Sequence, residues 1–299
     1  MSTRARGPVA GRIGFTLLFA GAVVLSAVTA ALVAPLIAYA LAVAGAHLVF
    51  PRIFDRVVMV TAVAVLMLGA GPLGLRELFR GGFRDLRASL PLFLAGLGAA
   101  VAIIIVLLTL AAWTTERPLM AGGLAIRALR NLAAALLIGV FEEAFFRAVL
   151  LAGLRREFGV RVALIVSSII YALAHLLRAP QHYYLTGFHP AAGFDNLAAS
   201  LSRMAHPDGL IPMVFGLFLL GLVLGEAFIL TGRVYLSIGL HVGFILGAKC
   251  WSLVAGPPHA IPGWLAGTGP VPLIAAPAAW IASLILLLSM RAWFGGKAQ

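Results

Sequence analysis

Long uninterrupted apolar runs are the feature that most constrains how this 299-residue chain can fold. A helix needs about 20 predominantly apolar residues to cross the roughly 30 Å of hydrocarbon in a bilayer. Eight runs approach or exceed that length, and they cover residues 13–50, 57–75, 90–113, 132–154, 162–177, 210–230, 234–254 and 271–290. The runs predict an all-α polytopic membrane protein with about eight transmembrane helices in one bundle.

The composition agrees with this prediction and excludes most classes of soluble protein. Hydrophobic residues make up 62% of the chain and charged residues 11%, against about 45–50% and about 25% in ordinary globular proteins. A net charge of +12 would suggest nucleic-acid binding in a soluble chain. Here nearly all the basic residues are arginines, and many lie beside the ends of apolar runs, which is typical of positive-inside topology. We therefore expect the lipid bilayer, and no nucleic acid, as a partner.

The first run, residues 13–50, is long for one span and short for two, and Pro35 lies near its middle. If a cytoplasmic N-terminus is followed by a single crossing, the most basic loop also becomes cytoplasmic; it contains Arg76, Arg80, Arg84 and Arg87. A hairpin would move that loop outside. The positive-inside rule therefore favours eight spans with both termini cytoplasmic, and residues after Pro35 are expected to extend the first helix or bend back. A signal peptide is disfavoured because the run is too long for one.

Three acidic residues lie inside the apolar runs: Glu142, Glu143 and Glu226. A carboxylate within a span costs roughly 2.5–3.5 kcal/mol on insertion scales, so the adjacent pair indicates a function. On a helix, Glu143 and Arg147 are four residues apart and share a face, which predicts an ion pair. Glu142 is rotated by about 100° from Glu143 and lacks that local partner. It is therefore the better candidate for a general base.

Two histidines, His175 and His241, also lie within apolar runs. With Glu142 they form a glutamate and two histidines on three different predicted helices. Such a set supports hydrolysis, in which Glu142 and His175 activate a water and His241 donates a hydrogen bond to the oxyanion. The other possibility is a catalytic zinc site, although no His-Glu-x-x-His helix is present. We predict no bound cofactor, with zinc as the alternative.

These motifs resemble the CAAX protease and bacteriocin-processing family (CPBP), which comprises the type II CAAX prenyl endopeptidases and their bacterial relatives. The first family motif, Glu-Glu-x-x-x-Arg, is matched by Glu142, Glu143 and Arg147. The second, Phe-x-x-x-His, is matched at His175 with Tyr171 in place of the phenylalanine. The resemblance extends over about residues 132–254 and implies an eight-span fold with the motifs on the fourth, fifth and seventh spans.

The third family motif is a histidine followed four residues later by asparagine or aspartate. His241 matches it, but the later position is Ile245. The resemblance thus implies that one oxyanion donor is missing or comes from elsewhere, and loss of one such donor costs about 10²–10³ in rate. The conceivable substitutes are Tyr171, Ser237 and Lys249. We expect an active but divergent enzyme, because the first motif and both histidines are intact.

The resemblance implies a glutamate-dependent intramembrane endopeptidase that cleaves a membrane-anchored or lipidated peptide or protein. In it, Glu142, His175 and His241 are catalytic, while Glu143, Arg147 and Tyr171 support them. Prenylated proteins, bacteriocin precursors and C-terminally anchored sorting substrates all fit the family. The alternatives are an impaired scaffold that only binds a membrane peptide, a zinc-dependent protease, and a proton-coupled transporter. Low lysine content and abundant alanine, glycine and arginine indicate a high-GC bacterium and its inner membrane.

The expected organisation is one structural domain with three regions. Residues 1–130 hold the N-terminal helices and the basic cytoplasmic loop, residues 131–255 the CPBP-like catalytic core, and residues 256–299 the C-terminal helix. Residues 178–209 are predicted to be a long polar loop, with solvated histidines at 182, 189 and 206. Glu226, in the sixth span, is expected either to pair with Arg233 or another arginine or to select substrate.

Overall fold

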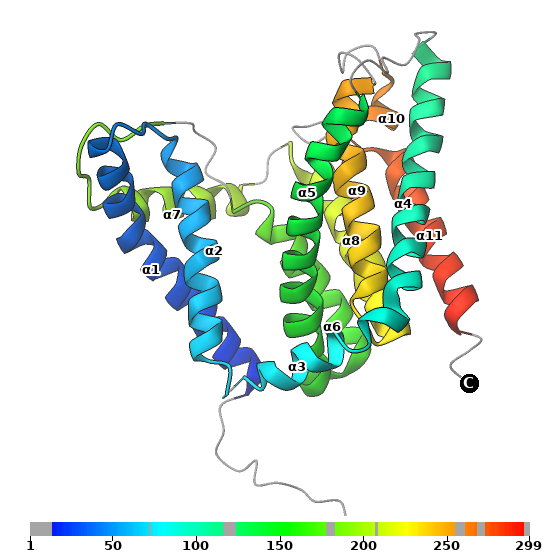
Figure 1. Cartoon of the computed structure of the whole chain (residues 1–299), viewed down its shortest axis with the longest axis horizontal. Coiled ribbons are helices and arrows are strands. Elements are labelled where there is room, and N and C mark those ends of the chain that lie inside the picture. The colour runs from blue at the N-terminus through cyan, green and yellow to red at the C-terminus, as the bar shows by residue number, and fades with distance from the viewer. Residues whose placement is uncertain are drawn as a thin grey trace, which may run out of the picture. The chain divides into compact units, whose positions relative to one another are not determined.

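The computed structural model describes residues 14–71, 73–115, 124–177, 183–206, 209–254, 261–267 and 273–295. Throughout these ranges the regular structure is helical, which confirms the predicted all-α class (Figure 1). The predicted cytoplasmic N-terminal residues 1–13 and the predicted loop histidine His182 lie outside the described residues.

Four of the described helices are long and apolar enough to cross a membrane. They are α1 (Phe15–Val43), α4 (Leu86–Thr115), α8 (Ile211–Thr231) and α11 (Pro277–Gly295). A shorter apolar helix lies within α9 (Tyr235–Val254). These helices support an integral membrane protein, while the count of eight spans stays a prediction.

The chain divides into two compact units, the first of which contains residues 1–75 and 181–197. Helix α1 continues through Pro35 to Val43, so the residues after the proline extend the first helix, as expected. The chain then reverses into α2 (Phe50–Leu68). The two helices pack small residues of α1 against larger ones of α2, in a core of Ala30, Ala31, Ala34, Ala38, Phe50, Ile53, Phe54 and Val57. The span predicted at 57–75 therefore begins and ends earlier than its hydropathy indicated.

Residues 178–209 are not simply a loop, because they contain the helix α7 (Ala192–Ala205). The buried side chains of α7 are Ala192, Asn196 and Ser200, which are four residues apart and so share one face. A buried face made of small and polar residues carries no hydropathy signal. The prediction of an unstructured polar segment was wrong for that reason.

The second unit contains residues 76–180 and 198–299. After the short amphipathic helix α3 (Leu75–Gly82) and α4, the chain forms α5 (Leu124–Glu143), a π-helix η1 (Ala144–Leu151) and α6 (Ala152–Ala174). Helices α8, α9, α10 (Gly263–Ala266) and α11 follow. Helix α9 packs against both α4 and α5, and α8 packs against both α6 and α11 (Figure 1). Residues on α9 can therefore meet residues on α5 inside this unit, and α8 packs against both α6 and α9.

Glycines allow α4 and α9 to approach closely. A Cβ atom built on Gly96 of α4 would overlap the backbone of Leu236 and Leu240 of α9, and one on Gly239 would overlap the carbonyl of Phe93. Small residues at helix crossings permit this backbone contact in membrane proteins. The contact fixes the position of α9, and with it that of His241.

We predict that Gly96→Ala destabilises the protein, because the added methyl group has no space at this crossing. Overpacking of this kind costs about 1–3 kcal/mol. The matched control is Gly98→Ala on the same helix, where a Cβ atom would meet nothing within 4 Å. Thermal unfolding in detergent should show a lower midpoint for Gly96→Ala and an unchanged or higher one for Gly98→Ala. Equal midpoints for the two variants would contradict the close crossing.

Candidate active site

The first motif lies where α5 passes into the π-helix η1. Single π-helical turns widen the backbone and occur frequently at functional sites. Glu143 is fully buried, and its Oε2 lies 3.2 Å from Nε of Arg147, which is also buried. The predicted ion pair is therefore present. Arg147 also donates from Nη2 to the carbonyl of Gly221 on α8 at 3.3 Å, and its guanidinium lies 4.7 Å from the centre of the Tyr171 ring.

His241 of α9 is buried and is held at both ring nitrogens. Its Nδ1 lies 2.9 Å from Oε1 of Glu143, and its Nε2 lies 3.3 Å from the hydroxyl of Tyr171. The carboxylate of Glu143 faces Arg147 and can only accept, so Nδ1 of His241 carries the hydrogen. In the neutral ring, Nε2 is then the acceptor for the Tyr171 hydroxyl. The tautomer follows from these contacts.

His175 ends α6 as its C-terminal cap. Its Nδ1 lies 2.8 Å from the carbonyl of Tyr171, one turn earlier, so Nδ1 donates and Nε2 presents a lone pair in the neutral ring. Nε2 of His175 lies 3.9 Å from Oε2 of Glu142, and Nε2 of His241 lies 3.7 Å from the same oxygen. The fold thus brings Glu142, His175 and His241 together from three elements.

Oε2 of Glu142 is buried and has no hydrogen-bond partner among the described residues. Both imidazole nitrogens are too distant from it for a direct hydrogen bond. A buried carboxylate oxygen needs a partner, and polar contacts longer than 3.5 Å are commonly bridged by water. The geometry therefore suits a water molecule between the carboxylate and the histidines.

A cavity of about 170 Å³ adjoins the two histidines and Tyr171. Its polar lining consists of Tyr171, His175, His241 and Ser283, and the rest is apolar: Ile103, Ile104, Leu107, Leu217, Leu220, Phe244, Ile245, Ala248, Leu273, Ile274, Ala279 and Ala282. The apolar wall comes from α4, α8, α9 and α11 and from the residues just before α11. It was not predicted, because a single Leu or Ile that lines a cavity looks in sequence like any other residue of a span.

The possible substitutes for the missing oxyanion donor occupy different places. Ile245 lines the cavity and presents no polar atom there. Ser237 donates to the carbonyl of Val234 and does not line the cavity, and Lys249 does not line it either. The hydroxyl of Tyr171 is the one of the three that contacts His241.

Of the predicted site residues, Tyr171, His175 and His241 line the cavity, whereas Glu226 does not. Oε1 of Glu226 accepts from Nε of Arg291 at 2.8 Å, which links α8 to α11. Arg233, the sequence-local partner that was considered, pairs with Asp85 at 3.1 Å instead. The expectation that another arginine neutralises Glu226 is therefore correct, and that arginine lies 65 positions away in sequence.

Among the described residues, no group of three His, Cys, Asp or Glu side chains has an arrangement that could hold a metal ion. His241 already uses both ring nitrogens in contacts with Glu143 and Tyr171. Glu143, His241 and Tyr171 form a hydrogen-bonded cluster, and Glu142 and His175 lie beside it.

Comparison with known proteins identifies the segment that carries this cluster. Residues 123–246 match the model of a family described as Type II CAAX prenyl endopeptidase Rce1-like. No curated protein and no solved structure matches the chain. The matched segment contains Glu142, Glu143, Arg147, His175 and His241. The resemblance predicted from the motifs is confirmed for this part of the chain: residues 123–246 are similar to the Rce1-like domain of the type II CAAX prenyl endopeptidase (CPBP) family.

Proposed function

We propose that the protein is an intramembrane endopeptidase that hydrolyses a peptide bond in a membrane-anchored or lipidated substrate by means of a glutamate-activated water. The observation that supports this most directly is the buried Oε2 of Glu142. It lies 3.7 Å from Nε2 of His241 and 3.9 Å from Nε2 of His175, with no hydrogen-bond partner among the described residues.

In this proposal Glu142 is the general base and His175 helps to position the water. His175 donates from Nδ1 to the carbonyl of Tyr171, so its Nε2 accepts one water hydrogen while Glu142 accepts the other. As Glu142 takes the proton, the water oxygen bonds to the substrate carbonyl carbon and an oxyanion forms. When the C–N bond breaks, Glu142 returns that proton to the leaving amine.

Tyr171 supplies the hydrogen bond to the oxyanion in this proposal. His241 cannot donate from Nε2 in its neutral form, because its hydrogen lies on Nδ1 toward Glu143. The Tyr171 hydroxyl, 3.3 Å from that Nε2, can rotate its hydrogen toward an oxyanion in the adjoining cavity. His241 is then a positioning residue on the oxyanion side, and Glu143 and Arg147 hold its tautomer.

The cavity indicates the chemistry of the substrate. Its largely apolar wall suits an apolar side chain or lipid group next to the scissile bond. Glu226 influences this wall indirectly, since its pair with Arg291 holds α11 against α8, and Ala279, Ala282 and Ser283 of α11 line the cavity. We propose this indirect effect on the cavity wall as the substrate-selecting role of Glu226.

We also propose that the enzyme lies in a bacterial inner membrane with both termini cytoplasmic.

We predict that Glu142→Gln lowers cleavage of a membrane-anchored peptide in proteoliposomes by about 10²–10⁴-fold, because general acid–base catalysis contributes that much. The control is Glu77→Gln, since the Glu77 side chain is 79% exposed. Mass spectrometry of the peptide termini measures the rate. A Glu142→Gln enzyme as active as the wild type would contradict the mechanism. If the protein were only a binding scaffold, both the wild type and Glu142→Gln would capture the peptide without cleaving it.

Tyr171→Phe should lower the rate by about 10²–10³-fold, the typical cost of one oxyanion donor. Adding Ile245→Asn to that variant places an amide on α9 one turn after His241, on the wall of the same cavity. We expect part of the activity to return, with little change in KM. A purely structural role for Tyr171 would be revealed by a lowered unfolding temperature and no recovery in the double variant.

Removal of metal should leave the activity unchanged. The test is cleavage after dialysis against EDTA, with elemental analysis of the dialysed protein. Full activity in metal-free protein is the expected result. Loss of activity that zinc restores at one ion per chain would support the zinc-dependent alternative instead.

A further inference from the structure

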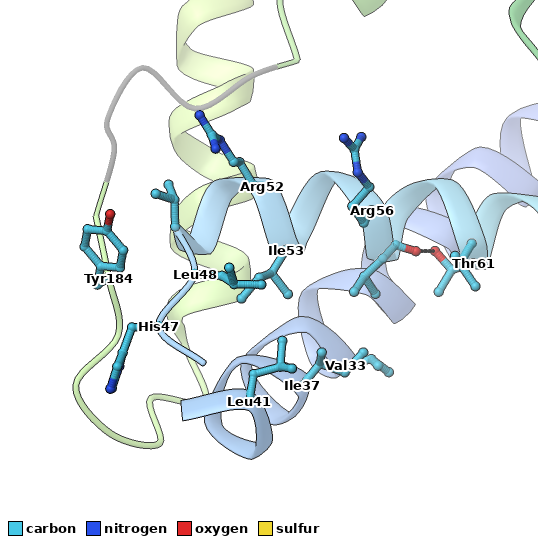
Figure 2. A pocket seen from close by; sticks show the side chains of 13 residues that line it. Val33, Ile37, Leu41, His47, Leu48, Arg52, Ile53, Arg56, Thr61 and Tyr184 are labelled. Atoms are coloured by element: carbon cyan, nitrogen blue, oxygen red, sulfur yellow. Dashed lines mark hydrogen bonds between the residues drawn. The ribbon is translucent and has the colours of Figure 1, made fainter. Parts of the chain in front are cut away.

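A second and larger cavity lies in the first unit. It has a volume of about 600 Å³ and is lined by α1, by the turn at residues 47–49, by α2 and by Tyr184. Figure 2 shows the cavity and its lining side chains. None of the predicted catalytic residues lines it, so the proposed protease chemistry does not account for it.

One part of the cavity is apolar. Val33, Ile37 and Leu41 follow one another at four-residue spacing on α1, and they face Ile53 of α2 (Figure 2). Thr61 also lines the cavity, but its hydroxyl already donates to backbone carbonyls of its own helix. This part offers few hydrogen-bonding groups. An extended peptide would leave polar backbone groups unpaired there, at a cost of several kcal/mol each in an apolar environment. An acyl chain has no polar groups and would not pay this cost.

The other part is cationic. Arg52 and Arg56 both line the cavity, are exposed to solvent, and lie four residues apart, so they share a face of α2. Figure 2 shows both side chains on the same side of α2, with their charged ends apart from the apolar side chains of α1.

No carboxylate of the described residues forms a salt bridge with this pair. The cavity lining contains no Asp or Glu. Asp55 is on the same helix but does not line the cavity. Two adjacent guanidinium groups are well suited to binding a phosphate.

The cavity also borders helix surface that is available to lipid. Helix α1 is a candidate membrane span, and Leu32 and Leu36, beside the lining residues Val33 and Ile37, are 56% and 54% exposed. An exposed leucine surface on a membrane span is expected to contact acyl chains. The apolar part of the cavity is therefore adjacent to lipid.

From these observations we propose that the cavity is a binding site for an anionic phospholipid. One acyl chain lies against Val33, Ile37 and Leu41 of α1 and Ile53 of α2, and the phosphate is bound by Arg52 and Arg56. A soluble phosphate would use only the cationic part, and a neutral lipid only the apolar part. An anionic lipid uses both.

The test is native mass spectrometry of the full chain, released from nanodiscs that contain phosphatidylglycerol and phosphatidylcholine in equal amounts. Wild-type protein should retain phosphatidylglycerol preferentially. The variant Arg52→Gln/Arg56→Gln should lose affinity roughly fivefold for each arginine removed, which is about the effect of one basic residue at an anionic bilayer surface. Arg87→Gln is the matched control, an exposed arginine in the first turn of α4, and should retain the lipid.

A second variant tests the apolar part without a change in charge. Val60 lines the cavity and is 68% exposed, so Val60→Trp should fill space with little effect on folding. It should also reduce the amount of retained phosphatidylglycerol. Equal retention by wild type and both cavity variants would overturn the proposal, as would equal losses in the cavity variants and Arg87→Gln. Competition by soluble glycerol phosphate at the same affinity as the lipid would reduce the site to an anion site and also overturn it.

Discussion

The buried ion pair between Glu143 and Arg147 is the interaction on which the polar centre of this protein depends. A single uncompensated charge inside a span is costly, by about 2.5–3.5 kcal/mol on insertion scales. Here the carboxylate has the guanidinium at 3.2 Å, and the guanidinium contacts the Gly221 carbonyl and the Tyr171 ring. Removing one partner of a buried pair usually destabilises a protein far more than the pair contributes, because the other charge remains buried. Because each of these two buried charges has a partner, the other polar groups of the cluster surround a neutralised pair.

The same pair controls the chemistry of its neighbours. Glu143 pairs with Arg147 and accepts from His241, so the hydrogen of His241 lies on Nδ1, which is 2.9 Å from Oε1 of Glu143. That tautomer turns an acceptor nitrogen toward the Tyr171 hydroxyl and toward Glu142. The order of contacts is thus arginine, glutamate, histidine and tyrosine. His175 lines the cavity, and Glu142 lies beside His175 and His241. Glu143 and Arg147, which in the sequence look like supporting charges, thus decide which ring nitrogen of His241 donates and which accepts.

Hydropathy predicted where the apolar helices lie, but it did not predict their ends or the helix whose buried face is small and polar. Pro51 in the first turn of α2 marks a helix start that the apolar run placed later, because proline is favoured there. Helix α7 was missed because its buried face consists of Ala192, Asn196 and Ser200. The ion pair of the first motif was predicted correctly, although its arginine lies in a π-helical turn rather than an α-helical one.

The sequence by itself determined that this chain forms helices, several of them long and apolar enough to cross a membrane, and it singled out Glu142, Glu143, His175 and His241. It could do so because an ionisable group within an apolar run is conspicuous at any position. Only the tertiary structure decided the partners: His241 with Glu143, 98 positions apart, and with Tyr171, 70 positions apart. It also decided which apolar residues form the two cavities. Those choices depend on how helices cross, and crossings at glycines such as Gly96 and Gly239 are set by contacts between distant segments, which a local sequence pattern does not contain.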